Sequence, residues 1–340
     1  MNEAVTIKDV ANELGVHPST VSRALDPAKR GLVGKDVVQR VIETAQRLGY
    51  TPDAAAATLR RGRSKLIGVI VPDIANPVFS PIIGGLENAL AEVGYALIVA
   101  DQPADAKSRL DIIETLVARR VDGLVLATAA LIDDAVERCI RRGVPVVLVN
   151  RAEESDRAPS VVSDDVEGMK LAVEHLISLG HQRIIHLAGP KALSTGSLRR
   201  KGFKSAMKAA GLSLSRHAIV ESTAFTRAAG ALAAAELLKR NPDATAIVAA
   251  NDLLALGAYE ALTSVGRRCP EDVSVVGHND MPLVDMVSPA LTSIRISHRE
   301  MGDAAGRLLV ALINGQETSG SRIVMRPTLI VRQSTAKAST

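Results

Sequence analysis

The chain has 340 residues and is 47% apolar, which suffices for two or three domains with sizeable cores. Its net charge of +4 falls within residues 1–65, which hold 11 Lys and Arg against 7 Asp and Glu, while the rest of the chain carries 30 of each sign. The chain has no membrane-length apolar run and no secretory signal, so we expect a cytoplasmic protein. Cys139 and Cys269 have no metal or disulfide spacing, and we expect both cysteines to be reduced and buried.

Residues 6–25 predict two short helices separated by a turn at Gly15. Thr6 and Asp9 have the spacing of a capping box at the start of the first helix. Apolar residues then recur at the i, i+3, i+4 and i+7 positions of one helix face. They are Ile7, Val10, Ala11 and Leu14. A third helix over about 35–48 closes this small core. The layout is typical of a helix-turn-helix, whose second helix enters the DNA major groove.

The second predicted helix begins at Pro18, where a missing N–H costs nothing. On its outer face Arg23 can donate a bidentate pair to guanine, and the hydroxyl groups can reach phosphates or bases. The predicted DNA contacts in this region are Thr6, Pro18, Ser19, Thr20, Ser22 and Arg23. The excess positive charge of residues 1–65 favours DNA binding through counterion release. The alternative for the same pattern is an ordinary helical hairpin.

Residues 51–65 form a predicted hinge or linker. Asp53 can cap a short helix over the alanines at 54–57, because Ala has the highest helix propensity. A helix of about six residues is well below the roughly 12–15 needed for stability alone. We therefore expect this helix to form only against a partner surface, and the alternative is a flexible basic linker.

Residues 66–340 alternate short β-rich runs with helix-length segments. The expected strands are 66–71, 96–100, 123–126, 146–149, 161–163, 183–188, 246–249 and 273–277. The expected helices include 81–93, 108–120, 166–179, 197–210, 228–240 and 252–265. This alternation predicts an α/β fold with doubly wound parallel sheets covered by helices on both faces. In such folds, ligands bind at the carboxyl ends of the strands.

Polar or aromatic residues follow many of the predicted strands. They include Asp73, Asn76, Phe79, Asp101, Asn150, Arg151, Asn251, Asn279 and Asp280. A single Asp or Asn at such a position is more often a helix cap than a ligand contact. We accordingly predict Asp165 and Asp252 as caps, and we interpret the recurrence of the other residues as a binding cleft.

The string Thr20-Val-Ser-Arg-Ala-Leu25 resembles the LacI/GalR family of bacterial transcriptional regulators. Several later segments resemble the sensor domain of that family, which is itself similar to periplasmic sugar-binding proteins. They are residues 71–79, 199–203, 250–252, 270–277, 291–294 and 331–335. Two departures stand in the first 50 residues. His17 replaces the usual serine cap, and the loop 26–32 is about two residues longer, with Gly34 in place of a Ser/Thr cap.

The resemblance implies three parts: a DNA-binding domain over 1–50, a hinge over 51–65 and an effector-binding domain over 66–340. Two similar lobes joined by three crossovers are implied for the last part. The N-lobe would comprise about 66–163 and 296–320, and the C-lobe about 164–295 and 321–340. In this family the hinge folds on operator DNA, pairs with that of a second subunit and inserts a leucine into the minor groove. Leu59 matches that leucine, and Arg60 would lie near the DNA backbone.

The expected effector contacts are Asp73 after the first strand and, by resemblance, Phe79, Asn150, Arg151, Arg199, Phe225, Asn251 and Asn279. An aromatic ring at Phe225 can stack on a sugar or a base, although a core position is an equal alternative. Asn279 stands where many sugar-binding members have an aspartate. Together with Arg151 and Arg199, this change favours an anionic effector such as a sugar acid or phosphate.

We therefore predict a ligand-responsive transcriptional regulator: a homodimeric repressor of a near-palindromic operator, switched by a sugar or sugar derivative. A nucleobase-type corepressor is the alternative within the same architecture, and the residues do not decide between an inducer and a corepressor. A solute-binding protein is disfavoured by the first 65 residues. An enzyme is disfavoured because the pair Asp164-Asp165 has no accompanying nucleophile–base or metal spacing. No catalytic residue, cofactor, metal site or membrane partner is predicted.

Overall fold

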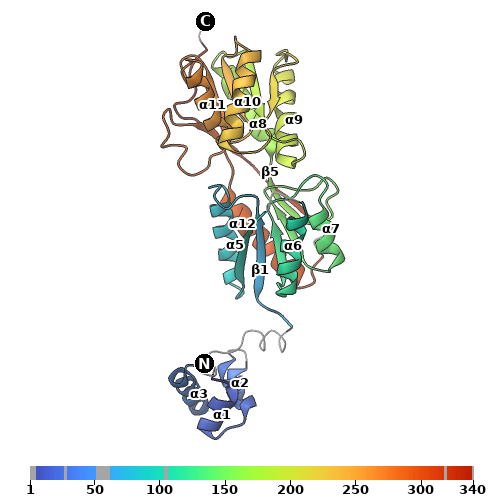
Figure 1. The fold of residues 1–340 in the computed structure, drawn as a ribbon, viewed down its shortest axis with the longest axis vertical. Helices are drawn as coiled ribbons and strands as arrows, with labels where there is room; N and C mark the ends of the chain where they lie inside the picture. Colours follow the sequence, from blue (N-terminus) through green and yellow to red (C-terminus); the bar gives the residue numbers. More distant parts are fainter. Residues whose placement is uncertain (1–4, 27–28, 51–61, 103–105, 318–319, 339–340) are drawn as a thin grey trace. The chain divides into compact units, whose positions relative to one another are not determined.

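The computed structural model describes residues 5–26, 29–50, 62–102, 106–317 and 320–338, and the chain divides into two units, Met1–Ser64 and Lys65–Thr340 (Figure 1). The predicted hinge helix, with Leu59 and Arg60, lies outside the described residues. Within the described ranges, no helix combines the length and apolar character needed to cross a membrane.

The first unit is a small helical domain, as the apolar spacing predicted. Its helices are α1 (Ile7–Leu14), α2 (Pro18–Leu25), the 3-10 turn η1 (Arg30–Leu32) and α3 (Lys35–Leu48). One side of each α-helix contributes to a common core. The buried members are Val10, Ala11, Val21, Ala24, Val38, Val41 and Ala45. Burial of this apolar face stabilises three helices that are each too short to persist alone.

Local hydrogen bonds set the helix boundaries in this unit. The carboxylate of Asp9 accepts the backbone N–H of Thr6 at 2.8 Å and its hydroxyl at 2.7 Å, at the start of α1. Gly15 ends α1 with a φ of 64°, a conformation that glycine adopts without strain. The Nδ1 of His17 accepts the backbone N–H of Ser19 at 3.2 Å. His17 therefore caps α2 itself, and the departure from serine leaves the cap intact.

The N-lobe of the second unit is a six-stranded parallel sheet in the order β11-β5-β4-β3-β1-β2. Its strands are β1 (Leu66–Val71), β2 (Ala96–Asp101), β3 (Gly123–Leu126), β4 (Val146–Val149), β5 (Ser160–Ser163) and β11 (Arg322–Met325). Its helices are α5 (Phe79–Ala91), α6 (Ala106–Ala118), α7 (Asp134–Arg141) and α12 (His298–Ile313). Alternate residues of β1 enter different clusters, since Val69 packs with α5 and α12 while Ile70 packs with α6 and α7. Helices therefore cover both faces, as predicted.

The C-lobe is a second six-stranded sheet in the order β12-β10-β9-β8-β6-β7. Its strands are β6 (Ile184–Ala188), β7 (Ile219–Glu221), β8 (Ala246–Ala249), β9 (Ser274–Asn279), β10 (Thr292–Arg295) and β12 (Thr328–Ile330). Its helices are α8 (Asp165–Ser178), α9 (Ser194–Ala209), α10 (Arg227–Arg240) and α11 (Asp252–Ser264). The strand pairs are parallel except β10 with β12, which is antiparallel. Figure 1 shows each lobe with its own strands and helices, and both lobes have this doubly wound arrangement.

The chain passes between the lobes three times: after β5, after β10 and after β11. The sequence-based boundary for the last passage, at residues 320 and 321, is too early. Residues 322–325 form β11, which pairs with β5 at the edge of the N-lobe sheet. The passage therefore lies between Met325 and Thr328. A short edge strand whose Ile323 and Val324 are exposed has little periodic signal, which explains the error.

The predicted caps Asp165 and Asp252 are each wrong by one residue. Asp164 caps α8 by accepting the N–H of Glu167 at 3.0 Å, and Asn251 caps α11 by accepting the N–H of Leu254 at 2.9 Å. A cap residue has an extended backbone that turns its side chain back over the first turn. The next residue is already helical, so Asp165 and Asp252 point into the lobe and are buried. Burial raises the pKa of Asp252 to about 7.

Close contact between α5 and α12 generates a stability prediction. A Cβ on Gly302 would lie 2.0 Å from the carbonyl oxygen of Ile82, so Gly302→Ala forces these two helices apart. We expect the free energy of unfolding of the second unit to fall by about 1–3 kcal/mol, measured by urea denaturation. Gly31→Ala is the control, because a Cβ there meets nothing within 4 Å. Equal midpoints for both variants would contradict this packing.

Candidate functional site

A pocket lies at the carboxyl ends of the parallel strands, between the two lobes of the second unit. Its lining comes from the N-lobe loops after β1 and β4 and from α9, the β7–α10 loop and the ends of β8 and β9 in the C-lobe. The lining residues are Asn76, Val78, Phe79, Asn150, Arg151, Thr195, Arg199, Phe225, Asn251 and Asn279. The position is the one that doubly wound folds use for ligands.

Seven of the eight predicted effector contacts lie together in this pocket lining. The exception is Asp73, which is exposed and whose carboxylate accepts the N–H of Ala75 at 2.9 Å. Asp73 therefore stabilises the turn after β1, and Asn76 from the same loop lines the pocket instead. Sequence reasoning did not select Val78 or Thr195. The sequence predicts that this helix starts at residue 197, which leaves Thr195 in the preceding loop. In the structure, α9 begins at Ser194 and includes Thr195.

Arg199 is tied into the C-lobe by three bonds of its guanidinium group. Its Nε donates to Asp165 at 2.7 Å, one Nη donates to the carbonyl of Ala250 at 2.6 Å, and the other donates to the side chain of Asn279 at 3.3 Å. Both members of the ion pair are buried. Burial raises the pKa of Asp165, and the charge of Arg199 opposes that rise. The positive charge of Arg199 is thus balanced within the lobe.

Arg151 has a different environment. It is 9% exposed, and its guanidinium forms no hydrogen bond or ion pair with any residue that the structure describes. Its Cζ lies 6.0 Å from the centre of the Phe225 ring, at the outer limit of a cation–π contact. Burial, with a smaller contribution from Arg199, lowers the pKa of Arg151 to about 10, so the group remains a cation at neutral pH.

The amide side chains of the pocket also have structural roles. Asn150 and Asn279 adopt φ angles of 66° and 114° at the ends of β4 and β9, and Asn tolerates this region better than most residues. Asn251 is the cap of α11. Backbone geometry therefore accounts for part of the asparagine pattern, while the same amides remain in the lining as possible partners for ligand hydroxyl groups.

Phe225 forms one wall of the pocket and is half-buried rather than fully enclosed. Its ring occupies the space beside Gly189, where a Cβ would lie 2.2 Å from the ring Cζ. A side chain at position 189 would therefore displace the ring. Of the two alternatives for this residue, an aromatic wall of the pocket describes its position better than an interior core residue.

The first turn of α9 also faces this site through Thr195. The Oγ1 of Thr195 is buried and has no hydrogen-bond partner among the described residues. The residue before the helix, Leu193, provides no side-chain cap, and the first turn contains no acidic residue. The N-terminus of a helix carries unpaired N–H groups and a partial positive charge. This end of α9 therefore presents donors without a matching acceptor.

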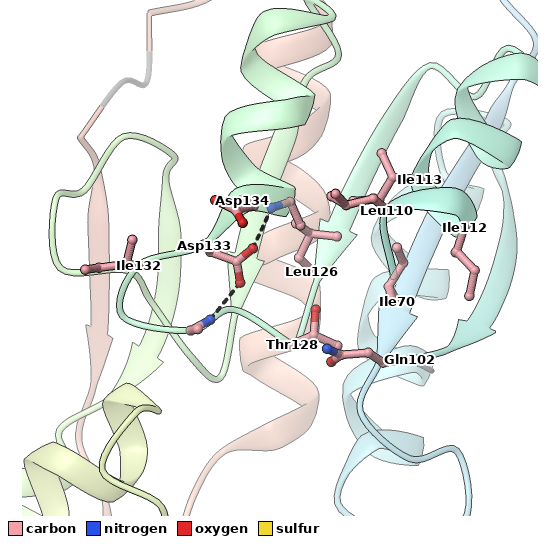
Figure 2. Close-up of a pocket in the computed structure, with 12 residues that line it drawn as sticks. Ile70, Gln102, Leu110, Ile112, Ile113, Leu126, Thr128, Ile132, Asp133 and Asp134 are labelled. Atoms are coloured by element: carbon pink, nitrogen blue, oxygen red, sulfur yellow. Dashed lines mark hydrogen bonds between the residues drawn. The ribbon is translucent and has the colours of Figure 1, made fainter. Parts of the chain in front are cut away.

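A larger cavity of about 140 Å³ lies within the N-lobe, near α6, α7 and the ends of β1 and β3 (Figure 2). Its lining is mainly aliphatic. The carboxylate of Asp133 accepts the N–H groups of Ala130 and Ala135, each at 2.7 Å, and so caps α7. Of the two carboxylates in this lining, Asp133 is used as this cap and Asp134 lies in the first turn of α7, so we assign the candidate site to the pocket between the lobes. Among the described residues, no group of three His, Cys, Asp or Glu is placed to hold a metal ion.

The first unit presents a second candidate surface on α2. Ser19 and Arg23 are exposed, and Pro18, Thr20 and Ser22 are partly exposed on the same short helix, which has no acidic residue. The hydroxyl of Thr6 is engaged with Asp9 at the start of α1. The exposed donors of α2 are of the kind that contact phosphates and base edges.

Two family models match the chain and together cover most of it. Residues 6–53 match the bacterial regulatory proteins of the lacI family, and residues 64–333 match the periplasmic binding proteins and sugar binding domain of the LacI family. The HTH-type transcriptional regulator DegA of Bacillus subtilis (strain 168) is 32% identical over 98% of this chain and 99% of its own length.

Solved structures show the same relationship over nearly the whole chain. The lac repressor dimer bound to operator and the anti-inducer ONPF has a TM-score of 0.84 and 27% identity, covering 98% of this chain and 100% of that one. The complex of the transcriptional regulator CelR with cellobiose has a TM-score of 0.76 and 31% identity, covering 97% and 99%.

The buried Asp165–Arg199 pair gives a prediction for stability. Asp165→Asn leaves Arg199 with an uncompensated buried charge, so we expect the free energy of unfolding to fall by about 3–5 kcal/mol in urea denaturation. The half-exposed pair of Arg200 and Glu221, 3.3 Å apart, is the control, and Glu221→Gln should cost at most about 1 kcal/mol.

Adding Arg199→Gln to Asp165→Asn should recover part of the loss, because no buried charge then remains unpaired. A single Asp165→Asn variant no less stable than Glu221→Gln would contradict the described pair.

Proposed function

Since the chain belongs to the LacI family of bacterial regulatory proteins and is a ligand-responsive DNA-binding regulator, we propose that it acts as a homodimeric repressor switched by a sugar or sugar derivative. The observation that carries the proposal is the pocket lined by both lobes in a chain that also bears an exposed, donor-rich helix α2. The CelR complex with cellobiose supports a sugar-type effector.

In this proposal, α2 enters the major groove of operator DNA. Arg23 donates to a guanine edge, while Ser19, Thr20 and Ser22 reach phosphates or bases and Pro18 contacts the groove wall. Two such units related by two-fold symmetry would read a near-palindromic site. Leu59 would enter the minor groove at the hinge, and Arg60 would contact the backbone beside it. As a regulator of chromosomal DNA, the protein would work in the cytoplasm.

The sensor would respond through the relative position of its lobes. Phe79 and Asn150 reach the pocket from the N-lobe, whereas Phe225 and Asn279 reach it from the C-lobe, so a bound molecule contacts both. The pocket of about 20 Å³ is smaller than a sugar, and in this proposal the lobes separate to admit one. A ligand shifts operator affinity only if it binds one lobe arrangement more tightly than the other.

A nucleobase-type corepressor is the second candidate, and the ring of Phe225 supports it because an aromatic face stacks on a base as readily as on a sugar. We further propose that the chain has no catalytic role and is not a transport solute-binding protein, since the relatives that it matches over nearly its whole length are transcriptional regulators.

The proposal predicts coupling between effector and DNA. Sugars, sugar acids and nucleobases that raise the melting temperature should change operator affinity in fluorescence anisotropy by about 5–150-fold, the usual range of allosteric coupling. A ligand that increases operator affinity is a corepressor, and one that decreases operator affinity is an inducer. Ligands that stabilise the protein while leaving operator affinity unchanged would contradict the proposed switch.

Leu59→Ala tests the hinge. Loss of a minor-groove wedge removes the contacts that offset base unstacking, so operator affinity should fall at least about tenfold. Ligand-induced thermal stabilisation should stay unchanged, because residue 59 lies outside the sensor. Leu232→Ala, which truncates an exposed leucine on α10, should alter neither measurement. Unchanged operator affinity in Leu59→Ala would refute this role.

A further inference from the structure

The pocket between the lobes carries an unbalanced positive charge. Its lining contains two arginines, Arg151 and Arg199, and no carboxylate. The charge of Arg199 is neutralised by Asp165 at 2.7 Å. No acidic side chain among the described residues pairs with Arg151. Arg199 is thus paired within the C-lobe, whereas Arg151 has no such partner among the described residues.

Because Arg151 is buried, its lack of an ion-pair partner among the described residues needs a physical explanation. A buried cation without a counter-charge loses its hydration and destabilises the fold, so proteins normally pair or expose such groups. Arg151 is 9% exposed and its Nε has no hydrogen-bond partner among the described residues. A guanidinium in this state is well suited to bind a carboxylate or phosphate through two parallel hydrogen bonds.

Further donors line the same pocket. The buried Oγ1 of Thr195 is unpartnered within the described chain, and Thr195 lies in the first turn of α9, a 16-residue helix with neither a side-chain cap nor an acidic residue at its start. The N–H groups and dipole at this helix end favour a negative charge. Both features belong to the start of α9, and they favour the same kind of ligand group as Arg151, which follows β4 in the N-lobe.

We propose that the effector carries an oxyanion, a carboxylate or a phosphate, which Arg151 binds together with Thr195 and the first turn of α9. This inference rests on the proposed function, because it describes the ligand of the same pocket. The remaining lining suits the rest of a sugar derivative: Phe79 and Phe225 offer aromatic faces, and the asparagine amides can bind hydroxyl groups.

The first test uses inorganic phosphate and acetate as probes on the full chain. Melting temperatures are compared in phosphate, acetate and chloride at equal ionic strength for the wild type, Arg151→Gln and Arg119→Gln. Arg119 is exposed in the N-lobe, so its variant loses the same charge far from the pocket lining. General salt effects on stability act on all three proteins alike.

We expect phosphate or acetate to raise the melting temperature of the wild type and Arg119→Gln above that of Arg151→Gln. In chloride, Arg151→Gln should melt at or above the wild-type temperature, because an unpaired buried charge has been removed. If Arg151 had a purely structural role, Arg151→Gln would instead melt below the wild-type temperature. An equal response of all three proteins to both anions overturns the proposal, whether or not any sugar binds.

The second test separates the two sources of the oxyanion. Calorimetry with D-glucose, D-gluconate and D-glucose 6-phosphate compares a neutral, a carboxylate and a phosphate ligand of similar size. The preferred anion should bind the wild type at least tenfold more tightly than glucose, and Arg151→Gln should lose that preference. Tighter binding of glucose overturns the oxyanion proposal, yet a glucose-dependent change in operator affinity would leave the proposed function standing.

Discussion

The buried pair of Arg199 and Asp165 organises the floor of the pocket. One guanidinium joins α9 to α8 and also binds the residue after β8 and the end of β9, so four elements of the C-lobe meet at a single charged group. Each bond satisfies a donor that would otherwise be buried alone, which favours one arrangement of these elements. The pair also balances its own charge, whereas Arg151, on the N-lobe side of the pocket, has no ionic partner in the part of the chain that the structure describes.

The placement of these two arginines on different lobes links the chemistry of the pocket to its movement. Arg199 is fixed within the C-lobe, whereas Arg151 follows β4 of the N-lobe and reaches the ring of Phe225 across the pocket. A ligand that pairs with Arg151 while contacting α9 stabilises lobe arrangements in which both surfaces meet around it. Differential binding of this kind is what converts occupancy into a change of operator affinity.

Much of this molecule is predictable from its sequence, for identifiable reasons. The capping box of α1 and the apolar spacing of α1, α2 and α3 are local signals, and strand ends in a doubly wound fold predict where polar residues converge. Long-range information was lacking. Sequence does not show that Asp165, 34 positions away, neutralises Arg199, or that β11 belongs to the N-lobe. The bond from Ala75 to the carboxylate of Asp73 is instead a local turn signal, which the prediction missed. Cap and first helical residue differ by one position, which misplaced Asp165 and Asp252.

The different roles of Arg151 and Arg199 can be tested directly by NMR of their Nε–H groups in ¹⁵N-labelled full-length protein. Arg151→Lys and Arg199→Lys assign the two signals by their disappearance. During titration with inorganic phosphate, the Arg151 signal should move with saturation while the Arg199 signal stays close to its starting position. Movement of the Arg199 signal with an unchanged Arg151 signal would show that Arg151 is not the anion-binding arginine.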